Sequence, residues 1–302
     1  MQSNSANSEV WLDKVATLIE SLPYMKQYSG LSVVIKFGGH AMGEQAFIEA
    51  FSSDIVLLRQ VGAKPVVVHG GGPQIGSMLE RLKMESNFID GLRVTDQQTI
   101  SIVEMVLAGA INKSLVASIA SSGGMAVGIS GKDGNLIKAK KLAHKTRDSD
   151  SAIENLVDLG YVGIPQKVDT QVLDALIGSG MIPVVAPLGL GVDGKTYNIN
   201  ADTAAGSIAS ALGASRLIML TDVEGVLDAS GKLIPRLSIG QARQLISSGV
   251  INGGMIPKVE TCIEAVNSGA GAAVIVDGRK QHAVLVELFT EHGIGTLIHA
   301  DK

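Results

Sequence analysis

Residues Val33–Gly39 read VVIKFGG, an apolar run that carries a lysine in its interior and ends at two glycines. An isolated ammonium group is costly to desolvate, so a buried strand rarely contains one without a function. Gly38 and Gly39 let the backbone turn and approach a ligand closely. The pattern recurs at residues 65–73, where PVVV is followed by HGGGP. Either stretch alone is best interpreted as a tight turn, but the two together, with Lys36, predict a cradle for a phosphate or carboxylate.

The composition predicts a cytoplasmic enzyme with no nucleic-acid and no membrane partner. The 302 residues suffice for one large domain or two, and 46% of them are apolar. A net charge of -4 without a basic run argues against a nucleic-acid-binding surface. Cys262 is the single cysteine, and no apolar run approaches the length of a membrane span. The first residues include Glu9 and Asp13 and lack an apolar core, so they resemble neither a signal peptide nor a clear transit peptide.

Apolar periodicity alternates between strands and helices along the chain. Repeated strand-then-helix units predict an α/β fold with a mainly parallel sheet and helices on both faces. Thr95 and Gln98 have the spacing of a capping box and predict the start of a long helix. The clearest seam lies at residues 206–214, after which the alternation restarts.

A leader helix is predicted at residues 9–27, after a disordered start. Trp11, Val15, Leu18 and Leu22 fall on one stripe of this helix. Such a stripe packs on its own domain or docks on another subunit. Because the helix precedes the first core strand, we favour the subunit.

Three side chains suited to anion chemistry lie at turns and helix starts. Residues 197–202 read YNINAD, and Asp202 by itself is best interpreted as the N-cap of an alanine-rich helix. Lys258 follows a glycine turn at a helix start, where the helix dipole attracts anions, although surface lysines are common. Arg93 suits a bidentate carboxylate clamp; the alternative is a solvated hairpin arginine.

The remaining motifs are interpreted as structural. No GxxxxGK[ST] occurs, and the glycines at 189, 191 and 194 precede a turn where a nicotinamide-binding motif would open a helix. His69 is predicted to be structural and Cys262 to be a core residue. The sequence lacks a Ser/His/Asp set, a close carboxylate pair and a His or Cys metal cluster. Lysines directed at glycine turns favour in-line phosphoryl transfer, which requires positioning and charge neutralisation.

Six longer motifs occur in order along the chain. They are KFGGHAM from Lys36, VHGGGPQI from Val68, GLRVTD from Gly91, NINADTAA from Asn198, LTDVEGVLD from Leu220 and GGMIPKV from Gly253. Together they resemble the amino-acid kinase family, and within it the members that phosphorylate N-acetyl-L-glutamate. The resemblance runs from about residue 30 to the end and implies a three-layer αβα sandwich with a mainly parallel sheet, preceded by the leader at 1–28. It also implies an acceptor-binding lobe at 29–205 and an ATP-binding lobe at 206–302.

The resemblance implies transfer of the ATP γ-phosphoryl group to the side-chain carboxylate of N-acetyl-L-glutamate, as in arginine biosynthesis. Lys36 and Lys258 would stabilise the transferring group from opposite sides, and Asp202 would hold both lysines. The acceptor would be bound by the residues Gly71, Gly72, Arg93 and Asn198.

Magnesium would be held mainly by the phosphates of ATP, with few or no protein ligands and no protein metal site. The resemblance also implies a set of residues along the nucleotide. These are Gly38, Gly39, Asp222, Val223, Glu224, Gly225, Val226, Leu227, Val250, Ile251 and Asn252.

The leader helix suggests regulation. Members of the family with such a leader resemble arginine-inhibited homo-hexamers, built as trimers of dimers. We therefore expect L-arginine to bind near the leader and residues 293–296. Some relatives are controlled by a PII-type signalling protein, which the sequence leaves undecided.

Two other functions compete with this interpretation. A related enzyme of lysine synthesis would phosphorylate aminoadipate or a carrier-linked glutamate with the same lysines, although the GLRVTD stretch favours acetylglutamate. A nucleotide- or arginine-sensing protein on an inactive kinase fold would lack a lysine or Asp202, and all three are present.

Overall fold

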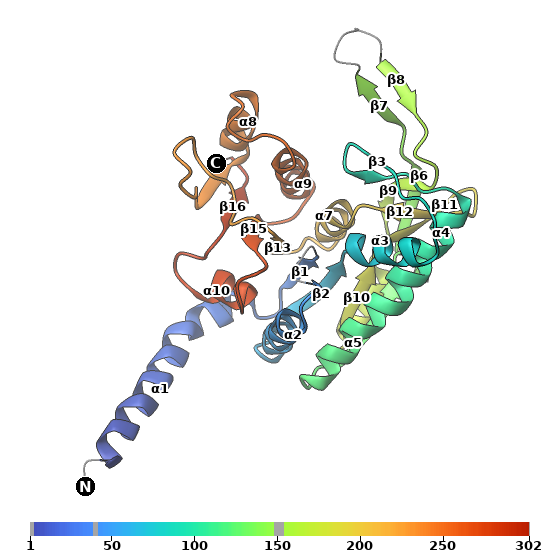
Figure 1. Ribbon diagram of the computed structural model, residues 1–302. Coiled ribbons are helices and arrows are strands. Elements are labelled where there is room, and N and C mark those ends of the chain that lie inside the picture. Colours follow the sequence, from blue (N-terminus) through green and yellow to red (C-terminus); the bar gives the residue numbers. More distant parts are fainter. Residues whose placement is uncertain (1–2, 39–41, 148–153, 302) are drawn as a thin grey trace.

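The computed structural model describes residues 3–38, 42–147 and 154–301, and shows a three-layer αβα sandwich with a mainly parallel sheet (Figure 1). The fold class predicted from the sequence is confirmed. The eight strands of the central sheet follow the order β14-β16-β15-β13-β1-β2-β10-β5. Neighbours run parallel except for β15 and β16. The boundary between the two lobes stays a prediction.

The elements have the following bounds. The helices are α1 (Ser3–Tyr28), α2 (Gln45–Gln60), α3 (Gly72–Arg81), α4 (Gln97–Glu104), the π-helix η2 (Met105–Ile111), α5 (Asn112–Ser121), the 3-10 turn η3 (Asp133–Asn135), α6 (Gln171–Gly178), α7 (Ala201–Ala211), α8 (Ile239–Ser247), α9 (Met255–Asn267) and α10 (Ala283–Phe289). The strands are β1 (Ser32–Phe37), β2 (Lys64–His69), β3 (Phe88–Ile89), β4 (Leu92–Arg93), β5 (Ala126–Ser130), β6 (Ile137–Lys141), β7 (His144–Arg147), β8 (Glu154–Val157), β9 (Val162–Val168), β10 (Ile182–Ala186), β11 (Leu188–Gly191), β12 (Thr196–Ile199), β13 (Arg216–Thr221), β14 (Arg236–Ser238), β15 (Ala273–Asp277) and β16 (Thr296–His299).

Strand β1 directs its side chains alternately to two hydrophobic cores. Val33, Ile35 and Phe37 belong to the core beneath α2, α5 and α10, whereas Val34 belongs to the core beneath α6, α7 and α9. Because strand side chains alternate with a period of two, Lys36 shares the face of Val34. The lysine of the VVIKFGG stretch therefore points toward α7 and α9.

The two glycine-rich stretches end at the same edge of the sheet. In the parallel register of β1 with β2, Lys36 lies opposite Val68 and Phe37 opposite His69. The Gly70 N–H donates to the Phe37 carbonyl at 2.8 Å. A ligand at this edge meets both strand ends together, which is where open α/β sheets bind their ligands.

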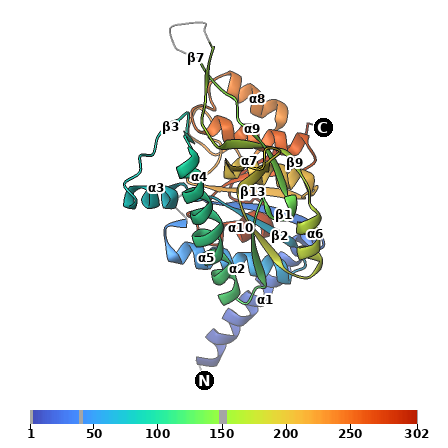
Figure 2. The ribbon, with the colours of Figure 1, turned by 90° about the vertical axis from the view of Figure 1, so that its right-hand side faces the viewer.

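A small β-barrel beside the sheet was not predicted. Strands β6, β9, β11 and β12 close on themselves, and β11 runs into β12 as an antiparallel hairpin. The glycines at 189, 191 and 194 lie in this hairpin, so the turn predicted there in place of a nicotinamide motif is confirmed. The β7-β8 hairpin projects beyond the barrel (Figures 1 and 2).

Three predicted helix starts were wrong. The helix after Thr95 is capped by Asp96, whose side chain accepts from the N–H groups of Gln98 and Thr99, while Thr95 donates to the Arg93 carbonyl. The cap of α7 is Asn200, so the prediction of Asp202 as N-cap was wrong. Helix α1 begins at Ser3, where disorder was predicted up to about residue 8.

Residues Gln97–Ser121 form a continuous helical run long and apolar enough to cross a membrane by length and composition alone. Its side chains Val103, Leu107, Leu115 and Ile119 are buried in the core that covers one face of the sheet. This packing is typical of a core helix. The run contains the π-helical turn η2, a geometry that is frequent at functional sites.

Candidate active site

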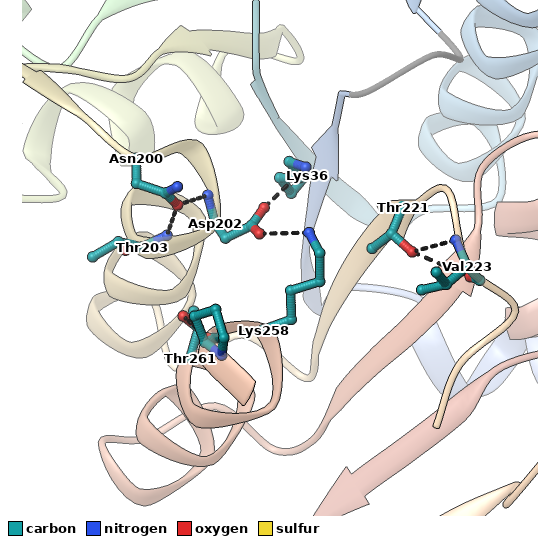
Figure 3. Close-up of polar contacts among 9 residues, drawn as sticks. Lys36, Asn200, Asp202, Thr203, Thr221, Val223, Lys258 and Thr261 are labelled. Carbon is teal, nitrogen blue, oxygen red and sulfur yellow. Dashed lines mark hydrogen bonds and ion pairs between the residues drawn. The ribbon is translucent and has the colours of Figure 1, made fainter. Parts of the chain in front are cut away.

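Asp202 holds two lysines that come from different parts of the chain (Figure 3). The Lys36 Nζ lies 2.9 Å from Oδ1 of Asp202, and the Lys258 Nζ lies 3.0 Å from Oδ2. Lys36 extends from β1, Asp202 from the first turn of α7, and Lys258 from the first turn of α9. The structure thus brings together the three residues predicted to carry the chemistry.

The charge balance of this cluster keeps Asp202 ionised. Burial by itself would raise the pKa of the Asp202 carboxyl, but the positive charges of Lys36 and Lys258 outweigh it and hold the pKa below its ordinary value. The N-terminus of α7 also favours a negative charge at this position. One carboxylate and two ammonium groups leave a net positive charge, which suits an anionic ligand.

A cavity of about 470 Å³ opens beside the three charged residues. Its lining combines ends of the central sheet, the first turn of α3, the β3-β4 hairpin and the start of α7. The predicted acceptor residues all line it. The lining residues used below are Lys36, Gly70, Gly71, Gly72, Phe88, Arg93, Asn198, Asp202 and Lys258.

Glycine at position 71 is required by close packing. Gly71 is the N-cap of α3, and a Cβ there would lie 2.5 Å from Cδ1 of Ile111 and 2.6 Å from Cδ2 of Leu107, both in η2. Gly72 begins the helix, and a Cβ on it would meet no atom within 4 Å. The first N–H groups of a helix have no partner within it, so this turn can donate to an anion in the cavity.

Arg93 is buried, so the alternative of a solvated hairpin arginine was wrong. Its guanidinium donates to the Gly72 carbonyl at 2.9 Å and to the Ser86 hydroxyl, and stacks 4.5 Å from the centre of the Phe88 ring. Burial lowers the pKa of Arg93, although an arginine stays charged under physiological conditions. Asn198 is half-buried on β12. Both side chains border the cavity.

The predicted nucleotide residues lie outside this cavity, on an exposed face. Asp222, Glu224 and Asn252 are exposed, whereas Val226 and Ile251 are buried in the core. Their backbone carries the loops that follow β13 and α8. Gly38 follows β1, and Gly39 lies outside the described residues.

Sequence reasoning missed a charged group on this face. The Arg279 guanidinium forms two bonds with the Asp277 carboxylate, at 2.8 and 2.9 Å, and Lys280 lies 3.5 Å from Glu224. The Gly278 N–H donates to the Thr221 carbonyl, which joins the ends of β13 and β15. The DGR run after a buried strand repeats the strand-to-glycine pattern and is the signal that could have revealed it.

The two residues interpreted as structural are both fully buried. Cys262 in α9 lies in the hydrophobic core, and burial raises the pKa of its thiol. The His69 ring contacts the Gly70 carbonyl and the Asn112 side chain. Asn112 was not singled out from the sequence.

The fold and the paired lysines define a phosphotransferase of the amino-acid kinase class. Residues 32–277 match the model of the Amino acid kinase family, and this chain belongs to that family. Among its relatives, a protein of Acidiphilium cryptum (strain JF-5) named acetylglutamate kinase is 62% identical over 280 residues, with 93% of this chain and 94% of the relative covered. A protein of the same name from Rhodospirillum centenum is 58% identical over 96% of this chain and 95% of the relative. The resemblance drawn from the six motifs is confirmed.

Solved structures share the fold. An N-acetylglutamate synthase from Neisseria gonorrhoeae, complexed with coenzyme A and N-acetyl-glutamate, is similar with a TM-score of 0.82 at 28% identity. The match covers 95% of this chain and spans 64% of the synthase. A carbamate kinase from Giardia lamblia has a TM-score of 0.62 at 17% identity, which shows the fold alone.

Proposed function

We propose that this chain transfers the γ-phosphoryl group of ATP to the side-chain carboxylate of N-acetyl-L-glutamate, giving N-acetyl-L-glutamyl 5-phosphate in arginine biosynthesis. The observation that carries the proposal is the Asp202 carboxylate between two lysines, at the wall of a cavity that also contains a buried arginine. Relatives over nearly the whole chain are named acetylglutamate kinase. Their names supply the acceptor, which the geometry alone leaves open.

In this reaction an oxygen of the acceptor carboxylate attacks the γ-phosphorus while the bond to the β,γ-bridging oxygen breaks and ADP leaves. No proton has to move, which agrees with a site that offers cations and N–H donors. Lys36 and Lys258 stabilise the charge that spreads over the equatorial oxygens, and Asp202 holds both lysines in place by offsetting their mutual repulsion. Arg93 binds the carboxylate that is not phosphorylated.

Magnesium would be held by the phosphates of the ATP substrate, where it would neutralise part of their charge. Among the residues that the structure describes, no group of three or more His, Cys, Asp or Glu side chains could hold a metal ion. The donor set fits an ion carried mainly by phosphates. The protein's own cations supply the rest of the charge neutralisation.

The direct test is formation of the acyl phosphate, trapped as the hydroxamate with hydroxylamine. The assay contains Mg-ATP and either N-acetylglutamate, glutamate or aminoadipate. We expect product with N-acetylglutamate alone. Product with aminoadipate would indicate an enzyme of lysine synthesis instead. No product with any acceptor would favour the alternative of a nucleotide- or arginine-sensing protein on an inactive kinase fold.

We also propose inhibition by L-arginine. A cavity of about 200 Å³ lies between the C-terminal turn of α1 and the loop before β16, lined among others by Tyr24, Arg216, Glu287 and Gly293. Glu287 offers a carboxylate there for a guanidinium. A synthase from Neisseria gonorrhoeae with a TM-score of 0.78 at 26% identity was solved with coenzyme A and L-arginine.

The leader helix supports a homo-hexamer. It projects from the body (Figure 1) and exposes Trp11, Leu18 and Ile19, each more than 60% accessible, while Tyr28 at its end is buried. We propose that this stripe docks on a second copy, as the leader of arginine-inhibited members does. Deleting residues 1–20 spares Tyr28 and should give an active dimer that arginine does not inhibit. An intact hexamer after the deletion would refute this role. A cytoplasmic location stays a prediction, and control by a PII-type protein stays undecided.

A further inference from the structure

His69 lies directly before the glycine turn of the candidate acceptor site. It is the last residue of β2 and immediately precedes Gly70–Gly72. Its Nδ1 lies 2.8 Å from the Gly70 carbonyl oxygen, and its Nε2 lies 3.2 Å from Nδ2 of Asn112, the first residue of α5. Both side chains are fully buried. A polar pair so deeply buried has to be matched in its hydrogen bonds.

The chemistry of the neighbours fixes the orientation of both groups. The Lys113 ammonium, which can only donate, contacts Oδ1 of Asn112 at 3.2 Å. The Asn112 Nδ2 therefore faces acceptors, which are the Val184 carbonyl at 2.9 Å, the His69 Nε2 at 3.2 Å and the Ile129 carbonyl at 3.3 Å. Its two hydrogens are shared among these three acceptors. Since a carbonyl can only accept, the His69 Nδ1 carries the proton and donates it to Gly70.

This arrangement requires a neutral imidazole. Burial lowers the pKa of His69 to about 4, so the ring is uncharged under working conditions. A protonated ring would turn a second donor toward the Asn112 amide, which is also a donor. His69 therefore acts as a rigid link and cannot serve as a general base.

The absence of a side chain at Gly128 leaves room for the Asn112 amide. A Cβ on Gly128 in β5 would lie 1.8 Å from Oδ1 of Asn112, so no other residue fits there without displacing the amide. Asn112 also follows directly on η2, whose Leu107 and Ile111 pack against Gly71. The same helical run thus contacts the glycine turn twice. Leu107 and Ile111 pack against Gly71, and Asn112 is connected to Gly70 through His69.

We propose that His69, held by Asn112, is a positioning residue for phosphoryl transfer, fixing the carbonyl of Gly70 so that the N–H groups of Gly71 and Gly72 point into the cavity. The proposal rests on the function proposed above. It assigns to His69 no contact with substrate. Donors that meet the charge of the transition state have to be held in place before the reaction, so loss of the link should lower kcat more than it raises KM.

Two substitutions test the two hydrogen bonds of His69 separately. In His69→Asn the side-chain amide nitrogen reaches nearly the place of Nδ1 and keeps the donor to Gly70. In His69→Gln the amide oxygen reaches nearly the place of Nε2 and keeps the bond with Asn112, but the donor to Gly70 is lost. We expect His69→Gln to lower kcat about 10- to 100-fold with the N-acetylglutamate KM changed by less than about threefold, and His69→Asn to lower kcat by less than about fivefold.

Ser52→Ala serves as the control for an effect on stability alone, because it removes another buried hydrogen bond. The Ser52 hydroxyl donates to the Ile48 carbonyl in α2 and shares a second hydrogen bond with the Ser118 hydroxyl, away from the cavity. This variant should lose thermal stability with kcat unchanged. Equal losses of kcat in His69→Asn and His69→Gln, or a change confined to KM, would overturn the proposal.

Hydrogen exchange of residues 70–79 decides the case independently of activity. We expect this segment to exchange about tenfold faster in His69→Gln than in His69→Asn, because only the former frees the first turn of α3. Equal exchange rates in the two variants would overturn the proposed positioning role of His69. Absence of hydroxamate with the wild-type chain would refute the proposed function, whereas the exchange result would still test the positioning role.

Discussion

The proposed acceptor side and the proposed nucleotide side of the molecule differ in how their charges are held. On the acceptor side, Lys36, Arg93 and Asp202 are largely buried and each has a partner within 3.0 Å. On the proposed nucleotide side, the exposed Glu224 and Lys280 lie 3.5 Å apart, although the buried Asp277 is bound by Arg279 at 2.8 and 2.9 Å. Exposed pairs contribute little because water and salt screen them. The comparison indicates that the charged side chains of the proposed acceptor side are mostly buried, whereas those of the proposed nucleotide side are mostly exposed.

The largest effect should come from the residue that holds both lysines. Asp202→Asn keeps the shape but removes the negative charge between Lys36 and Lys258, so the two cations repel each other. We expect kcat to fall about 10³-fold. The matched control is Asp158→Asn, which breaks an exposed pair with Lys141 and should leave kcat unchanged. Similar losses in both variants would show that the buried cluster has no special role.

The contact between the buried Asp54 and the exposed His282 should give a pH dependence of stability. Asp54 in α2 lies 2.6 Å from His282, which has a left-handed backbone (φ 57°) before α10. Burial raises the pKa of the Asp54 carboxyl to about 6, and the contact with His282 only partly offsets this. The folded pKa exceeds the unfolded one, so this stabilising contribution is complete below about pH 4 and is lost as the pH rises through 6.

Asp54→Asn removes that titration. The free energy of unfolding of the wild type, relative to the variant, should therefore fall by about 3 kcal/mol between pH 4 and pH 7.5. Urea unfolding of both proteins at several pH values measures the difference. A difference that stays constant across this range would contradict the raised pKa.

Arg93→Lys should weaken acceptor binding. A lysine keeps the charge but loses the planar fork that reaches Gly72 and Ser86 and stacks on Phe88. We expect the KM for N-acetylglutamate to rise about 30-fold, equivalent to about 2 kcal/mol, with the KM for ATP unchanged. Equal increases in both constants would erase the distinction between the two sides.

Asn252→Ala on the exposed side should have the smallest effect. Its side chain makes only long bonds, of 3.4 and 3.5 Å, to carbonyls of its own turn. We expect the KM for ATP to rise less than about fivefold, because an exposed amide with weak bonds contributes little. A rise as large as that of Arg93→Lys for acetylglutamate would show that the nucleotide side is built as tightly as the acceptor side.

Much of this fold could be predicted from local patterns. Lysine in an apolar strand, glycines after two strands and a carboxylate at a helix start singled out Lys36, Gly71 and Asp202, which the structure places along one cavity. Each of these patterns has a local physical meaning. Which residue caps a helix could not be predicted so well. Asp96 stands next to Thr95, and Asn200 stands two residues before Asp202, so each has another good cap nearby and only the backbone geometry decides between them.

Long-range pairs escaped prediction for a different reason. His69 meets Asn112 across 43 residues and Asp54 meets His282 across 228, and nothing in a local window joins them. The π-helix η2 has the apolar pattern of an ordinary helix, so periodicity does not reveal it. The β-barrel strands are short, from four to seven residues, and two of them contain glycines that weaken the strand pattern.

The central claim is that the paired lysines act in transfer and not in acceptor binding. The most direct measurement is the turnover of Lys258→Ala by hydroxamate formation, together with calorimetric binding of N-acetylglutamate to the same variant. We predict that kcat falls about 10²- to 10³-fold while the Kd of N-acetylglutamate changes by less than about threefold, because Lys258 meets its full charge only during transfer. An unchanged kcat with a weakened Kd would contradict the assignment and make Lys258 a binding residue.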